Sequence, residues 1–287
     1  MSPRPIFLVI APSLLLSVAR GDDGVPVHCL AGPSMKASIE ELARIYESRT
    51  GVRIIVESND PRSLISEIKV DGDADLFVSH DPFLAMLARD GVKVRQAWNA
   101  ASLSPVIAVA KGNPKGIRGL KDLARPGIRV GLTDPNMAIT GNIITLMLKK
   151  AGVDREVDAN VVKRAANGRD LGAALAAGEL DATFVWNAVV HANREKLEAV
   201  DIPEDQRPSR GAESMMHHPS LGRIELDHVR VTVALLAASR RADRSRAFAE
   251  FVASPEGAAV FRANGFSPVD PGRPPATVSP APDRGRR

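Results

Sequence analysis

Short apolar runs alternate with segments of helical periodicity along the first third of the chain. Residues 27–30, 52–56 and 74–79 are apolar runs of strand length, and the segments after them carry apolar residues at three- and four-residue spacing. The expected helices end near Thr50, Val70 and Arg89. This alternation of strands and helices predicts a mainly parallel sheet with helices on its faces.

A second alternating unit occupies the middle of the chain. It follows an apolar run at 103–110, which we expect to cross as one long strand from a first lobe to a second. Further strands are predicted at 128–132 and 182–186, together with a short helix at 116–124. The apolar run at 229–236 is placed to cross back to the first lobe.

These elements predict an α/β protein with two lobes, each a mainly parallel sheet flanked by helices, and a hinge of crossing strands. Residues 25–105 and 230–268 are assigned to the first lobe, and residues 106–229 to the second. Open α/β sheets bind ligands at the carboxyl ends of their strands, so the expected binding site is a cleft between the lobes.

The two ends of the chain differ from the rest. Residues 1–24 combine Arg4 with an apolar stretch at 6–18, which is too short to span a membrane comfortably and is followed by small residues. This pattern favours an export signal, with a retained N-terminal anchor as the alternative. Residues 269–287 are rich in Pro, Gly and Arg and predict a disordered tail. We therefore expect a periplasmic or extracellular protein.

Composition narrows the possible functions by exclusion. The chain has 287 residues, a net charge of +4 and only one tyrosine, with its basic residues spread out, so no nucleic-acid surface is indicated. The single cysteine, Cys29, can form no internal disulfide and is expected to be a buried thiol. His217 and His218 are adjacent in an irregular segment without the spacing of metal ligands, so no resident metal is expected.

The first helix begins in a way that suits an anion. An apolar strand ends at Leu30, the chain turns at Gly32-Pro33, and Ser34 stands at the expected N-cap of a helix with an apolar face. The unpaired N–H groups and the positive end of the dipole make a helix start attractive to anions. Three later segments repeat this layout, which predicts several such donors around one cleft.

Five segments of the chain carry a resemblance to a known family. They are Ala31-Gly32-Pro33-Ser34, the run Ala-Asp-Leu-Phe-Val-Ser at 74–79, Val-Gly-Leu-Thr-Asp-Pro at 130–135, Leu-Asp-Ala-Thr-Phe-Val-Trp at 180–186, and the closing run at 247–266. With these segments the chain resembles the molybdate/tungstate-binding proteins of bacterial ABC importers, which have the type II periplasmic solute-binding fold. The resemblance covers nearly the whole chain after the expected signal.

The resemblance also implies a binding site. In that family, hydroxyl and backbone N–H donors at helix starts hold a tetrahedral oxyanion. By position, the implied ligand-binding residues are Ser34, Arg62, Ser63, Thr140, Asp170 and Trp186. The family has consecutive serines where this chain has Asp60-Pro61-Arg62-Ser63, and Pro61 has no N–H to donate. Trp186 stands where the family often has tyrosine, and its indole N–H can only donate.

Each of these residues also has a simpler interpretation. Ser34, Thr140 and Asp170 are good helix caps whether or not they touch a ligand. Arg62 is equally consistent with a solvated helix residue, and Trp186 with a wall of the cleft or a core position. The sequence leaves both interpretations open at every one of these positions.

The resemblance implies a monomeric binding protein without a cofactor, which captures molybdate or tungstate and delivers it to an ABC permease. An enzyme is disfavoured, because the chain has no Gly-x-Ser-x-Gly elbow, no Gly-x-x-x-x-Gly-Lys loop and no His-Glu-x-x-His motif. The alternatives are another oxyanion such as sulfate, a different small solute, or a ligand sensor with this fold. A ferric-iron-binding protein is expected to use tyrosine side chains as ligands. The only tyrosine of this chain, Tyr46, is expected in the core, which disfavours that class.

Overall fold

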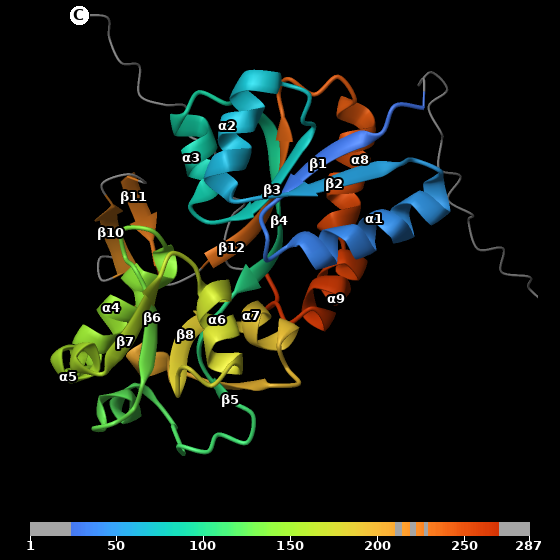
Figure 1. The fold of residues 1–287 in the computed structure, drawn as a ribbon. Helices are drawn as coiled ribbons and strands as arrows, with labels where there is room; N and C mark the ends of the chain where they lie inside the picture. Colours follow the sequence, from blue (N-terminus) through green and yellow to red (C-terminus); the bar gives the residue numbers. More distant parts are fainter. Residues whose placement is uncertain (1–23, 210–213, 219–221, 227–228, 270–287) are drawn as a thin grey trace, which may run out of the picture.

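The protein is described by a computed structural model that covers residues 24–209, 214–218, 222–226 and 229–269. It consists of two lobes, each built on a five-stranded sheet with helices on its faces, which confirms the expected two-lobe α/β fold (Figure 1). The expected export signal and tail lie outside the described residues, except for Gly24 and Val269. Among the described residues, none of the helices is long and apolar enough to cross a membrane.

Lobe 1 contains the sheet β2-β1-β3-β12-β4. Its strands are β1 (Val27–Ala31), β2 (Ile54–Ser58), β3 (Leu76–His80), β4 (Val94–Leu103) and β12 (Val229–Leu236). Its helices are α1 (Lys36–Thr50), α2 (Pro61–Asp71), α3 (Phe83–Arg89), α8 (Ala242–Val252) and α9 (Pro255–Ala263). Strands β1, β2 and β3 are parallel, whereas β12 runs antiparallel to both β3 and β4.

Lobe 2 contains the sheet β7-β6-β8-β5-β9. Its strands are β5 (Pro105–Ala110), β6 (Val130–Thr133), β7 (Val161–Ala165), β8 (Ala182–Trp186) and β9 (Leu197–Val200). Its helices are α4 (Ile139–Ala151), α5 (Asp154–Ala159), α6 (Gly168–Ala176) and α7 (Asn187–Ala192). Strands β6, β7 and β8 are parallel, and β5 is antiparallel to β8 and β9.

Several smaller elements differ from expectation. The helix predicted at 116–124 is a 3-10 helix, η1, over Leu120–Ala124. The irregular segment after residue 203 contains a second 3-10 helix, η2 (Glu204–Gln206), and a hairpin of β10 (Met215–His218) and β11 (Gly222–Glu225). His217 and His218 therefore lie on a strand and not on a loop.

The hinge also differs from a single crossing strand. The apolar run at 103–110 is divided between β4 and β5, which end and begin on either side of Ser104. The backbone N–H of Ser104 donates to Asn187 Oδ1 at 3.1 Å, and its hydroxyl lies 2.7 Å from Ser267 Oγ. The return crossing, β12, begins at Val229 beside β4, so both crossings lie together between the lobes (Figure 1).

The expected burial of Cys29 and Tyr46 is confirmed. Cys29 is inaccessible on β1, and burial raises the pKa of its thiol to about 12, so the thiol stays protonated and unreactive near neutral pH. Tyr46 packs between Phe248 and Phe251 of α8, with ring centroids 5.2 and 5.4 Å away. Both side chains pack in the core of lobe 1, away from the carboxyl ends of its strands.

Candidate ligand-binding site between the lobes

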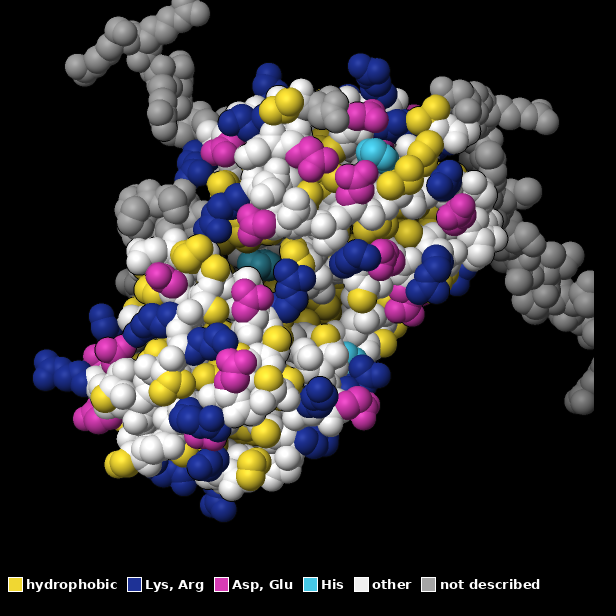
Figure 2. All heavy atoms as spheres, in the orientation of Figure 1, with side chains coloured by type: hydrophobic (Ala, Val, Ile, Leu, Met, Phe, Trp, Pro, Cys, Tyr) yellow, Lys and Arg dark blue, Asp and Glu magenta, His cyan; other side chains and the backbone are white. Residues whose placement is uncertain are grey.

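The carboxyl ends of the parallel strands of both lobes meet across the hinge. His80, the last residue of β3, faces Trp186, the last residue of β8, with ring centroids 5.9 Å apart. Arg62 of α2 donates from Nη2 to the carbonyl oxygen of Met137, before α4, at 3.2 Å. These two contacts join lobe 1 to lobe 2 at the place where open α/β sheets bind ligands. Figure 2 shows histidine atoms recessed in the surface between the lobes, with basic and acidic side chains around them.

The turn between β1 and α1 presents Ser34 to this region. Gly32 donates its N–H to the carbonyl of Val78 at 2.8 Å, and a Cβ on Gly32 would lie 2.7 Å from Met35 Cε, so a side chain at this position would have to displace the end of Met35. The expected N-cap role of Ser34 is wrong, because α1 begins at Lys36 with Met35 as its cap residue. The half-buried Ser34 hydroxyl forms no hydrogen bond with the described residues, and it therefore can donate to a ligand.

The start of α2 is capped by the side chain of Asp60, the residue before the helix. Asp60 Oδ1 accepts from the backbone N–H of Arg62 at 2.9 Å, and Pro61 occupies the first helical position. The Arg62 guanidinium lies over the Phe83 ring, 5.9 Å from its centroid, and reaches across the cleft. Ser63 is exposed, and its hydroxyl bonds none of the described residues. This turn therefore offers a guanidinium and a hydroxyl in place of a run of serines.

Thr140 lies inside α4 and is not its cap, because the helix is capped at Ala138. Its hydroxyl is 2.8 Å from the hydroxyl of Thr133, at the end of β6, and both side chains are buried. Two hydroxyl groups carry two protons, and the hydrogen bond between them uses one. The pair therefore retains one proton that can be donated to an anion.

Asp170 has a different role from the one expected. The N-cap of α6 is Asn167, whose Oδ1 accepts from the Asp170 N–H at 3.0 Å and whose Nδ2 donates to Asp170 Oδ2 at 2.9 Å. These hydrogen bonds stay within the first turn of the helix, and Asp170 is exposed. Its carboxylate can only accept hydrogen bonds when ionised, so this side chain does not suit an anion.

The structure adds His80, which the sequence interpretation missed. Its Nδ1 lies 2.7 Å from the carbonyl oxygen of Asp81, and the Phe83 and Trp186 rings flank it. Burial lowers its pKa from the ordinary value, which favours the neutral imidazole near neutral pH. A polar residue at the carboxyl end of a parallel strand was the signal that could have identified it.

Two buried hydroxyl groups of lobe 1 have no hydrogen-bond partner among the described residues. Ser38, in the first turn of α1, and Ser79, next to the end of β3, bond no other described residue through Oγ. A Cβ on Gly32 would be 3.4 Å from Ser79 Oγ, so Ser79 lies directly behind the turn that carries Ser34. Buried hydroxyl groups nearly always have a partner, so the unpartnered Ser79 hydroxyl beside this turn is consistent with a site for an acceptor.

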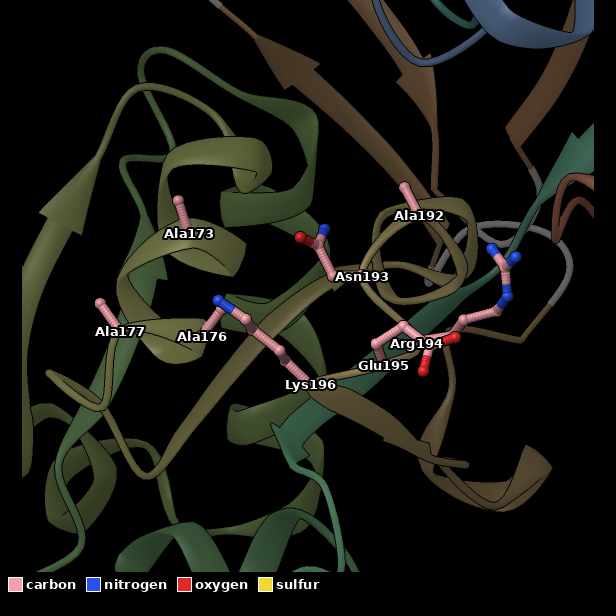
Figure 3. A pocket seen from close by; sticks show the side chains of 8 residues that line it. All are labelled: Ala173, Ala176, Ala177, Ala192, Asn193, Arg194, Glu195 and Lys196. Carbon is pink, nitrogen blue, oxygen red and sulfur yellow. The ribbon is translucent and has the colours of Figure 1, made fainter.

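The described residues include no group of three or more His, Cys, Asp or Glu side chains placed to hold a metal ion. A surface groove of about 470 Å³ lies elsewhere, between α6 and the turn after α7 (Figure 3). Half of its lining residues are alanines, and the amide of Asn193 there already donates to the carbonyl of Val189 at 2.8 Å. Its lining has no buried polar atom without a partner, so the donor set between the lobes is the better candidate site.

Two α/β lobes joined by crossing strands, with the carboxyl ends of their parallel strands meeting at the hinge, form the architecture of a solute-binding protein. The chain belongs to the bacterial extracellular solute-binding protein family, which matches residues 27–267. A Haemophilus influenzae relative, provisionally named a binding protein, is 24% identical over 265 residues, which cover 91% of this chain and 98% of the relative.

Two solved structures are similar over most of the chain. The substrate-binding domain of a provisionally assigned molybdenum ABC transporter from Clostridium difficile has a TM-score of 0.67 and 17% identity, covering 85% of this chain and 99% of that one. PEB3 of Campylobacter jejuni with bound L-phospholactate has a TM-score of 0.65 and 21% identity, covering 84% and 99%. At these identities the similarity shows the fold alone.

Proposed function

We propose that this protein captures a small oxyanion, molybdate or tungstate, in the interlobe cleft outside the cytoplasm and delivers it to an ABC permease. The observation that supports the proposal is that each lobe has a hydroxyl donor at or after the carboxyl end of a parallel strand. Lobe 1 offers the hydroxyl of Ser34, which bonds none of the described residues, and lobe 2 offers the spare proton of the Thr133–Thr140 pair. The structural similarity to a molybdenum transporter's binding domain supports this choice of ligand.

The proposed mechanism is closure of the two lobes around the anion. Each lobe alone has half of the donors, so only the closed arrangement lets one ligand use both halves, and the ligand favours that state. The hydrogen bond from Arg62 to the Met137 carbonyl links the two lobes. It supports a closed arrangement that these two residues stabilise. Neutral donors can bind an oxyanion without a fixed countercharge, as anions bind at helix starts. The ligand is bound and released, and it undergoes no reaction.

Calorimetric titration of the protein with molybdate, tungstate, sulfate and phosphate tests the proposal. Tight binding of the first two anions, with weak binding of the others, is the expected result. Binding of sulfate alone, or heat from none of the four, would contradict the proposed ligand.

Ser34→Ala is expected to weaken molybdate binding about tenfold, because one hydrogen bond to a charged group is lost and about 1.4 kcal/mol corresponds to tenfold in affinity. Ser48→Ala is the matched control in α1, the helix that follows Ser34, since the Ser48 hydroxyl donates to the carbonyl of Ile45 within that helix. Unchanged affinity in Ser34→Ala would remove this hydroxyl from the site.

A second candidate ligand is a sulfate-like oxyanion or a small phosphorylated solute. It is favoured by Arg62, because a guanidinium at the cleft recognises sulfate or phosphate oxygens in a bidentate manner. If this candidate is correct, Arg62→Gln should weaken phospholactate or sulfate binding more than molybdate binding in parallel titrations. If the substitution weakens the binding of all the anions equally, Arg62 contributes to lobe closure and does not distinguish between the ligands.

A further inference from the structure

His80 lies at the contact between the two lobes. It ends β3 in lobe 1, and its ring lies against Trp186 of lobe 2 and Phe83 of α3, at 5.9 and 5.2 Å between centroids. Trp186 is only 6% exposed, so the contact between the two rings is shielded from solvent where the lobes meet. A ligand held between the lobes would meet this ring.

The hydrogen bonds of His80 leave one ring nitrogen free. A carbonyl oxygen can only accept, so the 2.7 Å contact with the Asp81 carbonyl requires the proton of a neutral imidazole to be on Nδ1. Nε2, on the other side of the ring, has no hydrogen-bond partner among the described residues. In the neutral ring Nε2 is an acceptor, and only protonation makes it a donor.

Burial lowers the pKa of His80 more than two nearby carboxylates, Asp81 and Asp60, raise it. Asp81 is paired with Arg230 of β12, which donates from Nε to its Oδ2 at 2.8 Å. Asp60 is the cap residue before α2, and Arg62 of α2 packs on Phe83, which also touches His80. The contact from lobe 2 is the uncharged Trp186. An arriving dianion would add negative charge beside an imidazole that burial has kept neutral, and it would raise the pKa of His80.

We propose that His80 contacts the bound oxyanion through Nε2 and that binding is coupled to the uptake of a proton by this imidazole. The proton comes from the solvent, and the imidazolium donates from Nε2 to the anion while Nδ1 keeps its hydrogen bond. This inference rests on the proposed oxyanion function. It adds a residue that tunes affinity with pH, so that capture is stronger in a mildly acidic medium than in a neutral one.

Molybdate titrations in two buffers of different ionisation enthalpy measure the coupling directly. The expected result at neutral pH is uptake of up to one proton per ligand. Affinity should rise by up to about tenfold per pH unit as the pH falls between the pKa of His80 in the complex and its lower pKa in the free protein. In NMR titrations of the unmodified protein, the pKa of the His80 ring should rise when molybdate is bound.

His80→Gln should abolish the proton uptake and flatten the pH profile, whereas His28→Gln, in β1 of the same lobe, should leave both unchanged. The NMR and buffer measurements use the unmodified protein, so they decide the matter even if His80→Gln folds poorly. Molybdate binding without proton uptake and with a flat pH profile would overturn the role of His80 while leaving the proposed function intact. If none of the oxyanions binds between pH values of about 5 and 8, both proposals are wrong.

Discussion

Replacing Arg241 with methionine is expected to lower the free energy of unfolding by about 3–5 kcal/mol, because it leaves a buried carboxylate without its countercharge. Asp75, at the start of β3, is fully buried, and Arg241 Nε donates to its Oδ2 at 2.7 Å. The hydroxyl of Ser239 donates to the other oxygen at 2.6 Å, and Arg241 also donates to Asp73. The arginine side chain is only 11% exposed, so solvent screens this pair weakly.

Urea unfolding, followed by circular dichroism, measures the loss. Arg49→Met is the matched control, because Arg49 forms a two-pronged salt bridge with Glu256 of α9 in which both side chains are about half exposed, at 55% and 43%. Exposed pairs of this kind contribute little to stability, so a much smaller loss is expected. Equal losses in the two variants would show that burial of Asp75 does not determine the strength of its pairing.

The fold was largely predictable because strand and helix signals are local. The apolar runs at the positions of β1, β2 and β3 are each followed by a helix, and the structure places them side by side as parallel strands. β4 was missed because its sequence, Val-Arg-Gln-Ala-Trp-Asn-Ala-Ala-Ser-Leu, has no clear alternation of apolar and polar residues, and it lies at the edge of its sheet. Its ten residues are held by pairing with β12, which comes more than a hundred residues later.

The candidate site was only partly predictable. The cap assignments of Ser34, Thr140 and Asp170 were each wrong by one to three positions. The conformation of the preceding turn determines at which residue each helix begins. At Ser34 the turn is fixed by the hydrogen bond from Gly32 to Val78, on a neighbouring strand. The pairing of His80 with Trp186 joins two lobes, and no local pattern in the sequence encodes such a contact.

Gly141→Ala is expected to lower the free energy of unfolding by about 1–3 kcal/mol through overpacking. A Cβ at this position would lie 2.6 Å from the carbonyl oxygen of Thr133 and 2.7 Å from the backbone nitrogen of Pro135. Backbone atoms cannot move aside as the end of a flexible side chain can. The start of α4 must therefore shift away from β6, and the hydrogen bond between Thr133 and Thr140 is disturbed.

The same shift would displace the lobe 2 donors of the proposed site. We expect Gly141→Ala to weaken molybdate binding about tenfold, the loss of the one hydrogen bond that the Thr133–Thr140 pair can donate to the anion, at roughly 1.4 kcal/mol. Gly172→Ala in α6 is the matched control, because its Cβ would approach only the side chain of Val189, at 3.0 Å, and alanine favours a helix by about 1 kcal/mol over glycine. Calorimetric titration and urea unfolding of both variants separate the two effects. If Gly141→Ala is destabilised but binds molybdate normally, the start of α4 supports lobe 2 without contacting the ligand, and the lobe 2 donors must lie elsewhere along the cleft.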